Sequence, residues 1–153
     1  MRRGRSTPGR KALTRLGIPE PRAPSPTSVV GNDQYRAPWP DESFAQYANF
    51  RFYDWDTRDC RDPDDWPDQD AALTSSMAYW AKHPGTYHLV HTAGPCALAD
   101  LERTLGAATM ARLLKGYARD HRYGVSTTAD FKKTAQSMTD KDLASFWKTH
   151  RTR

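Results

Sequence analysis

Helical periodicity is clearest in the stretch Asp41-Glu42-Ser43-Phe44-Ala45-Gln46-Tyr47-Ala48-Asn49-Phe50-Arg51-Phe52. Apolar side chains recur there at intervals of three and four residues, which places them near one stripe of a helix. Asp41 stands at the start, where a carboxylate can accept hydrogen bonds from the amides of the first turn. The stretch therefore predicts an amphipathic helix over 41–52 with Asp41 as its cap.

Two further helices are predicted on the carboxyl side of this stretch. One covers 71–82 and is expected to stop at His83-Pro84-Gly85, because proline and glycine interrupt a helix. The next is expected to carry Pro95 in its first turn, where a missing N–H costs least, and to end at Gly106. Between them, 87–91 is the only segment whose alternation suggests a strand.

Three more helices are predicted in the last third of the chain. The first surrounds Leu113, and the second begins at Thr127 or Thr128, whose hydroxyl can accept from first-turn amides. The last is expected to open with Thr139 or Asp140 as its cap. Because helical patterns are so much stronger than strand patterns, the predicted fold class is all-α.

Residues 1–28 differ in composition from the rest. The chain has 153 residues and a net charge of +5, and this segment alone carries seven Arg and Lys residues against Glu20. The remainder, 29–153, is therefore slightly acidic. Five of the eleven prolines also lie in 1–28. Proline disfavours helices and the like charges repel, so we expect a disordered basic arm followed by one helical domain.

The remaining sequence signals give only weak indications of the cellular compartment and of the loop structure. No stretch of about 18 apolar residues and no secretory signal is visible, so the cytoplasm is the default expectation. Cys60 and Cys96 permit at most one disulfide and do not decide the compartment. Eight aspartates fall in 54–70, and without a calcium-binding register they predict a solvated acidic loop.

Self-sufficient catalytic motifs are missing from the sequence. None of the five histidines is followed by Glu in a His-Glu-x-x-His arrangement, which a helical zinc site requires. His88 and His91 lie three residues apart and are the nearest approach to a metal pair, although Pro84 and Gly85 disfavour a helix there. No serine lies in Gly-x-Ser-x-Gly, and no glycine-rich phosphate loop is present, so no nucleotide cofactor is implied.

The most specific motif spans 39–47 and reads Trp-Pro-Asp-Glu-Ser-Phe-Ala-Gln-Tyr, after Val-Val-Gly-Asn-Asp-Gln-Tyr-Arg at 29–36. It resembles the catalytic domain of aminopeptidase N-like zinc metallopeptidases, the gluzincin aminopeptidases. In that family a helical His-Glu-x-x-His precedes Trp-Leu-Asn/Asp-Glu-Gly/Ser-Phe-Ala-x-Tyr. The resemblance continues at Gly94-Pro95 and Leu105-Gly106 and covers about 29–153. It implies the carboxyl-terminal, helical half of a thermolysin-like catalytic domain, a zinc cofactor and a peptide substrate.

The resemblance assigns three residues to a site. Glu42 matches the family's third zinc ligand, a carboxylate that would complete a His/His/Glu set and leave one position for an activated water. His91 stands three residues before Gly94, where the family has its transition-state tyrosine. Tyr87, four residues earlier, is a possible substitute for that tyrosine.

Two of the three expected zinc ligands are missing. The spacing of the family places its histidines at 19 and 23, where this chain has Pro19 and Ala23. Glu20 coincides with the general-base position but lies between two prolines. We therefore expect a metallo-aminopeptidase fragment, truncated or frameshifted, that holds no zinc and is inactive by itself. A missing peptidase half or self-association could complete it.

A second class of function is open from the sequence. The chain could be a helical binding module whose Arg-rich arm contacts nucleic acid or an anionic membrane, although basic arms bind polyanions nonspecifically. Deleting 1–28 would distinguish the two hypotheses, because only the binding module would lose a salt-sensitive association.

Overall fold

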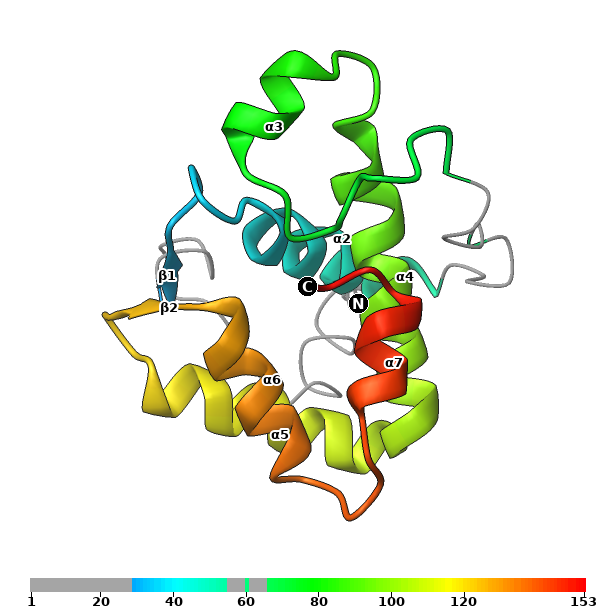
Figure 1. Cartoon of the computed structure of the whole chain (residues 1–153). Helices are drawn as coiled ribbons and strands as arrows, with labels where there is room; N and C mark the ends of the chain where they lie inside the picture. The colour runs from blue at the N-terminus through cyan, green and yellow to red at the C-terminus, as the bar shows by residue number, and fades with distance from the viewer. Residues whose placement is uncertain (1–28, 55–59, 61–65) are drawn as a thin grey trace, which may run out of the picture.

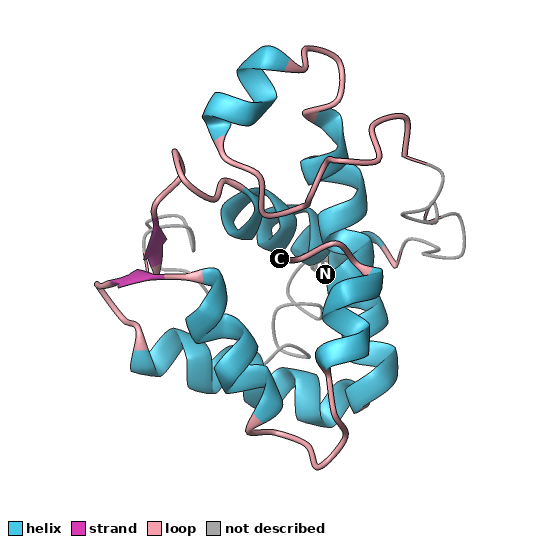
Figure 2. Ribbon diagram, viewed as in Figure 1, coloured by secondary structure: helices cyan, strands magenta, loops and turns pink. Residues whose placement is uncertain are grey.

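The computed structural model describes residues 29–54, 60 and 66–153, and within these ranges it is mostly helical. The described helices are α2 (Trp39–Tyr53), α3 (Met77–Lys82), α4 (His88–Leu105), α5 (Ala107–Asp120), α6 (Thr128–Gln136) and α7 (Ala144–Thr149) (Figure 1). Loops and two very short strands make up the rest of the described chain (Figure 2). This confirms the helical fold class. The predicted basic arm and most of the acidic loop lie outside the described residues.

Helices α2 and α4 pack against each other and form the centre of the fold (Figure 1). They approach most closely where Ser43 of α2 faces Gly94 of α4. A Cβ atom added to Gly94 would lie 1.7 Å from Ser43 Oγ and 2.7 Å from Ser43 Cβ, which no real contact allows. Glycine at 94 is therefore a packing requirement of this helix crossing.

An aromatic cluster fastens the other helices to this pair. Phe131 of α6 is almost fully buried, and its ring lies 5.2 Å from the rings of Phe44 and Tyr117 and 6.1 Å from Trp147. Trp39 Nε1 also donates a hydrogen bond to Thr128 Oγ1 (2.8 Å), which joins the start of α2 to the start of α6. Side chains from four helices thus share one apolar core.

The prediction of a helix over 71–82 was too long, because α3 begins only at Met77. Hydroxyl side chains before it hydrogen-bond the backbone and compete with helix formation. Ser75 Oγ accepts from the Ala72 amide (3.1 Å), and Ser76 Oγ caps α3 by accepting from the Tyr79 amide (3.3 Å). The buried segment 71–73 instead pairs with the chain end, where the Leu73 amide donates to the Arg151 carbonyl (3.0 Å).

The predictions of a strand at 87–91 and of Pro95 in a first turn were both wrong. Helix α4 starts at His88, so Pro95 lies in its interior. Leu89 and Val90 are both buried, which is a helical and not an alternating pattern. Packing against α2 outweighs the hydrogen bond that a proline removes from the helix interior. The end of this helix at Gly106, which has a positive φ of 84°, is confirmed.

Capping was predicted correctly for α6 and incorrectly for two other helices. Thr127 and Asp130 form a reciprocal capping box at the start of α6. Helix α2 begins at Trp39, so Asp41 lies inside its first turn and accepts a hydrogen bond from Gln34 Nε2. Helix α7 begins at Ala144, whose amide donates to Asp142 Oδ1 (2.8 Å), so neither Thr139 nor Asp140 is its cap.

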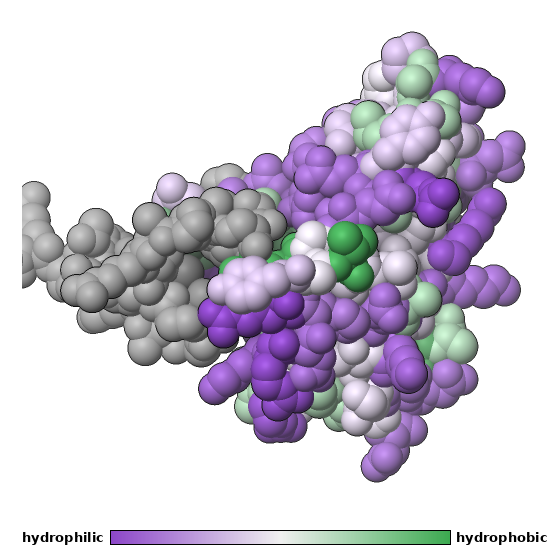
Figure 3. All heavy atoms as spheres, turned by 90° about the vertical axis from the view of Figure 1, so that its left-hand side faces the viewer, coloured by the Kyte–Doolittle hydropathy of each residue, from purple (hydrophilic) through white to green (hydrophobic). Residues whose placement is uncertain are grey.

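Two short strands, not predicted from the sequence, join distant parts of the chain. β1 (Gly31–Asn32) and β2 (Val125–Ser126) pair in parallel. The face that carries them is mostly hydrophilic, with scattered hydrophobic groups (Figure 3). Exposed large apolar side chains on the described chain are few, namely Tyr35, Tyr53, Tyr123 and Val125.

The acidic segment is tied down at its described positions. Cys60 forms a disulfide with Cys96 of α4, which realises the single bridge that two cysteines permit. Asp68 accepts a hydrogen bond from the Tyr79 hydroxyl, which lowers the pKa of the Asp68 carboxyl. Burial, and to a lesser extent this hydrogen bond, raises the pKa of Tyr79 to about 12. None of the described helices is long and apolar enough to cross a membrane.

Candidate active site

The helix crossing at Ser43 and Gly94 brings the predicted site residues together. Glu42 precedes Ser43 on α2, and His91 lies one turn before Gly94 on α4. Because Gly94 lets the two backbones approach closely, His91 Nδ1 reaches to 3.2 Å from Glu42 Oε2. The structure thus joins two residues that are 49 positions apart in the sequence.

This pair is only half-buried. The side chain of Glu42 is 39% exposed and that of His91 is 35% exposed. Solvent therefore reaches both groups. Glu42 thus has a half-buried position on α2.

Tyr87, the residue immediately before α4, is the third member of this group. Its ring packs edge to face against the His91 ring, with 5.3 Å between ring centroids. Partial burial raises the pKa of the Tyr87 hydroxyl, and the negative charge of Glu42 raises it further. All three residues that the sequence singled out therefore lie in one place.

His88, the second histidine of the possible metal pair, does not join this group. It is exposed, and its Nδ1 lies 2.6 Å from the Gly85 carbonyl oxygen. His88 and His91 do share a helix, contrary to the expectation from Pro84 and Gly85, because α4 begins after that turn.

The donor set at Glu42 and His91 falls short of a zinc centre. Among residues 29–54, 60 and 66–153, no three His, Cys, Asp or Glu side chains lie close enough together to hold a metal ion. A catalytic zinc takes three protein ligands and one water. The two groups present therefore do not fit, by themselves, the zinc centre that the resemblance implies.

Without a metal, the site offers an imidazole beside a carboxylate. An imidazole beside a carboxylate is the arrangement that general acid–base catalysis uses. Ser43, the hydroxyl next to Glu42 in the chain, is buried, and its Oγ donates to the Val90 carbonyl oxygen at 3.4 Å. It is therefore directed into the helix interface and not toward the imidazole as a nucleophile would be.

A second polar cluster, which the sequence analysis missed, lies further along the same two helices. The Tyr47 hydroxyl donates to Glu102 Oε2 (2.7 Å), and Arg51 Nη2 lies 3.4 Å from Glu102 Oε1. Tyr47 and Arg51 are four residues apart on α2, a spacing that places them on one face. No sequence signal could have found Glu102, which the chain brings in from 55 residues beyond Tyr47.

Comparisons bear on neither cluster. The chain gives no significant match to protein-family models, to curated proteins or to solved structures.

Proposed function

We propose that this chain is a fragment of an aminopeptidase N-like zinc peptidase, from the carboxyl-terminal helical part of a thermolysin-like catalytic domain, and that it hydrolyses no peptide by itself. The fragment would contribute Glu42, the third zinc ligand, while the two histidine ligands would have to come from elsewhere. Its reaction class would be metal-assisted removal of amino-terminal residues from peptides.

The observation that carries this proposal is the meeting of Glu42, His91 and Tyr87. The resemblance assigns these residues from two motifs that are distant in the sequence. Glu42 belongs to the first motif, and His91, 49 positions later, belongs to the second. The 3.2 Å separation of Glu42 Oε2 and His91 Nδ1 supports the proposal because both side chains reach the same place. Ser43 belongs to the first of these motifs and Gly94 to the second. Their tight contact gives a physical reason for a small residue at each of these two positions.

Inactivity follows from the chemistry that the chain lacks. Hydrolysis of an amide needs an activated water, a base and a group that stabilises the developing oxyanion. With His91 at the tyrosine position, an imidazole engaged with Glu42 replaces a phenol that would donate to the oxyanion. The carboxylate meant for a metal is instead paired with a neighbouring side chain.

The first arm of the test uses the unmodified chain. We expect calorimetry at neutral pH to show no tight stoichiometric zinc binding, and an aminoacyl anilide assay to show no turnover above buffer. Zinc-dependent cleavage that Glu42→Gln abolishes would overturn the claim of inactivity.

The second arm asks whether Glu42 is a latent ligand. A family-type helical segment carrying His-Glu-x-x-His replaces residues 19–28, together with His91→Tyr. We expect this graft to bind zinc and turn over substrate, and the same graft with Glu42→Gln to bind zinc at least tenfold more weakly. Equal zinc affinity in the two folded grafts would overturn the ligand assignment. Pro19→His with Ala23→His alone should fail, because Pro21, Pro24 and Pro26 prevent a helix.

A further inference from the structure

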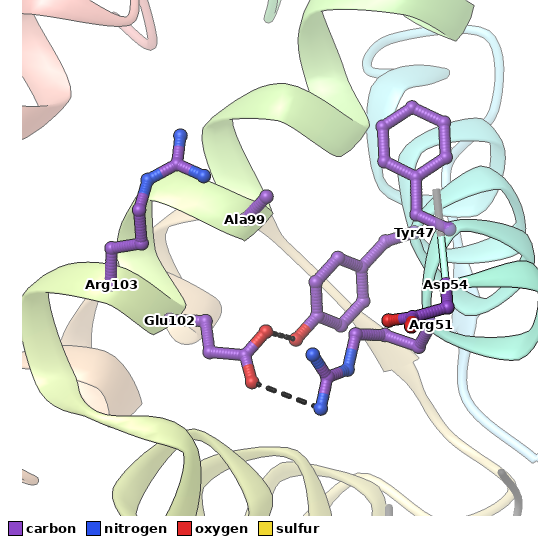
Figure 4. A pocket seen from close by; sticks show the side chains of 7 residues that line it. Tyr47, Arg51, Asp54, Ala99, Glu102 and Arg103 are labelled. Atoms are coloured by element: carbon purple, nitrogen blue, oxygen red, sulfur yellow. Dashed lines mark hydrogen bonds and ion pairs between the residues drawn. The ribbon is translucent and has the colours of Figure 1, made fainter. Parts of the chain in front are cut away.

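A cleft opens between the carboxyl-terminal halves of α2 and α4, away from the Glu42–His91 pair. Its volume is about 280 Å³, near the lower end of small-molecule sites. The lining residues are Tyr47, Phe50, Arg51, Asp54, Ala99, Glu102 and Arg103 (Figure 4). Arg51 lies nine residues beyond Glu42 on α2, which is about 14 Å along the helix axis. The two places are therefore separate.

Glu102 is a mostly buried charge in this cleft. Its side chain is only 14% exposed, and its two oxygens have different partners, the Tyr47 hydroxyl at 2.7 Å and Arg51 Nη2 at 3.4 Å. Figure 4 shows the Glu102 carboxylate directed from α4 toward both of these α2 side chains. Burial and this hydrogen bond raise the pKa of Tyr47, so the hydroxyl stays a donor and holds the carboxylate in place.

The contact between Arg51 and Glu102 is looser than the tyrosine bond. Charge-assisted N–H···O hydrogen bonds in proteins are usually about 2.7–2.9 Å long, and 3.4 Å exceeds that range. The guanidinium has five N–H donors, more than one carboxylate can occupy. Arg51 is also 38% exposed, so another anionic group can reach it from solvent.

The rest of the lining adds an apolar surface to this pair of opposite charges. The ring of Tyr47, the side chain of Phe50 and the methyl group of Ala99 border the cleft. Arg103 extends from α4 on the side away from Arg51 and pairs with Asp100 (Figure 4). The cleft thus places the Glu102 carboxylate, the Arg51 guanidinium and an apolar wall within the reach of one small molecule, and Asp54 and Arg103 also line it.

We propose that this cleft binds a free α-amino acid with an apolar side chain. The ligand's carboxylate would lie against Arg51 and its ammonium against Glu102, while its side chain would contact Phe50 and Ala99. A simple anion is disfavoured because Glu102 lies beside Arg51, and a simple cation is disfavoured because Arg51 lies beside Glu102. A molecule that carries an ammonium and a carboxylate on the same carbon complements the pair. This inference does not rest on the proposed peptidase ancestry.

The test is a titration of the full chain with L-leucine, in which binding is measured by changes in amide chemical shifts and by calorimetry. Two analogues each lack one charge: N-acetyl-leucine has no ammonium, and leucinamide has no carboxylate. We expect leucine to bind and each analogue to bind at least tenfold more weakly. Glycine, which has no side chain to place on the apolar wall, should also bind more weakly than leucine. Equal binding of leucine and either analogue would overturn the proposal, as would no binding of leucine.

Two variants locate the site. Glu102→Gln removes the charge but keeps an oxygen that can accept from Tyr47, and Arg51→Gln removes the cation, so each should weaken leucine binding at least tenfold. Arg112→Gln on α5 removes an exposed arginine outside the cleft and should leave the affinity unchanged. Glu42→Gln should also leave it unchanged, which separates this site from the proposed peptidase site. Loss of binding in either control, or unchanged binding in both cleft variants, would contradict the assignment.

Discussion

The α2–α4 pair carries a glutamate near each of its two ends, and the two glutamates have different surroundings. Glu42 projects from α2 toward His91 of α4 and is 39% exposed, whereas Glu102 projects from α4 toward Tyr47 and Arg51 of α2 and is 14% exposed. At the more exposed end, the partner of Glu42 is His91, which is charged only when protonated. At the more buried end, the partners of Glu102 are Arg51, a permanent cation, and the Tyr47 hydroxyl, which stays protonated.

This difference predicts that the two ends of the helix pair respond differently to substitution. A carboxylate that is two-fifths exposed contributes little to stability, because water screens its ion pair. A carboxylate that is mostly buried must be satisfied, because an unpaired buried charge is costly. We therefore expect substitutions at the Glu102 end to lower the free energy of unfolding more than substitutions at the Glu42 end.

Gly94→Ala should have the largest effect, since it disturbs the crossing that positions both ends. The new Cβ would lie 1.7 Å from Ser43 Oγ, and overpacking of this kind costs about 3 kcal/mol at the upper end of its usual range. Denaturant unfolding followed by circular dichroism measures the loss.

Gly116→Ala is the matched control, because Gly116 also lies inside a helix. A Cβ there would meet only Met138 Cε at 3.7 Å, an ordinary contact. Alanine is a better helix former than glycine, so this variant should gain up to about 1 kcal/mol. Similar stability changes in the two variants would refute the packing explanation for Gly94.

Tyr47→Phe should be next in size, because it removes one partner of the mostly buried Glu102 carboxylate. Losing such a hydrogen bond costs about 1–3 kcal/mol in the free energy of unfolding. The effect should also depend on alkaline pH. Tyrosine titrates near 10 in the unfolded chain, and burial raises the pKa of Tyr47 in the folded protein.

The sign of the pH dependence follows from that difference. The folded protein keeps the Tyr47 proton above pH 10 and the unfolded chain loses it, so stability is full below pH 10 and falls as the pH rises. The slope from this group is at most about 1.4 kcal/mol per pH unit. Unfolding curves at pH 8 and pH 11 should therefore differ less for Tyr47→Phe than for the unmodified chain. An equal pH dependence in both would mean that Tyr47 is not a buried, protonated donor.

His91→Gln should have the smallest effect on stability. It removes a half-exposed ion-pair partner of Glu42, and such pairs contribute about 0–1 kcal/mol. Thermal unfolding at low and high salt measures this small term and its screening. A loss as large as that of Tyr47→Phe would show that the two ends of the helix pair do not differ as proposed.

Local sequence patterns were sufficient for several parts of the fold. The periodicity over 41–52 predicted most of α2, and the hydroxyls of Thr127 and Thr128 predicted the start of α6. Gly106 was predicted to end α4 and does so with a positive φ. These features depend on residues within one or two helical turns, where intrinsic propensity and side-chain capping dominate.

The site was predicted only through a resemblance between motifs. Glu42, His91 and Tyr87 were assigned from it, and the structure brings them together. The cluster of Tyr47, Arg51 and Glu102 was not foreseen, because nothing local to Glu102 distinguishes it from an ordinary surface carboxylate on a helix. Its burial depends on which residue of α2 faces it.

By itself, the sequence determined that the fold is helical, that most of 41–52 forms a helix, that a helix starts at Thr127 or Thr128, and that another ends at Gly106. The tertiary structure decided that α4 continues through Pro95, that 71–76 stays irregular, and that Gly94 meets Ser43. The reason is physical. Caps and periodicity act over a few residues, whereas burial and close contact between helices arise only when distant segments pack, and that packing can outweigh a local preference of a few kcal/mol.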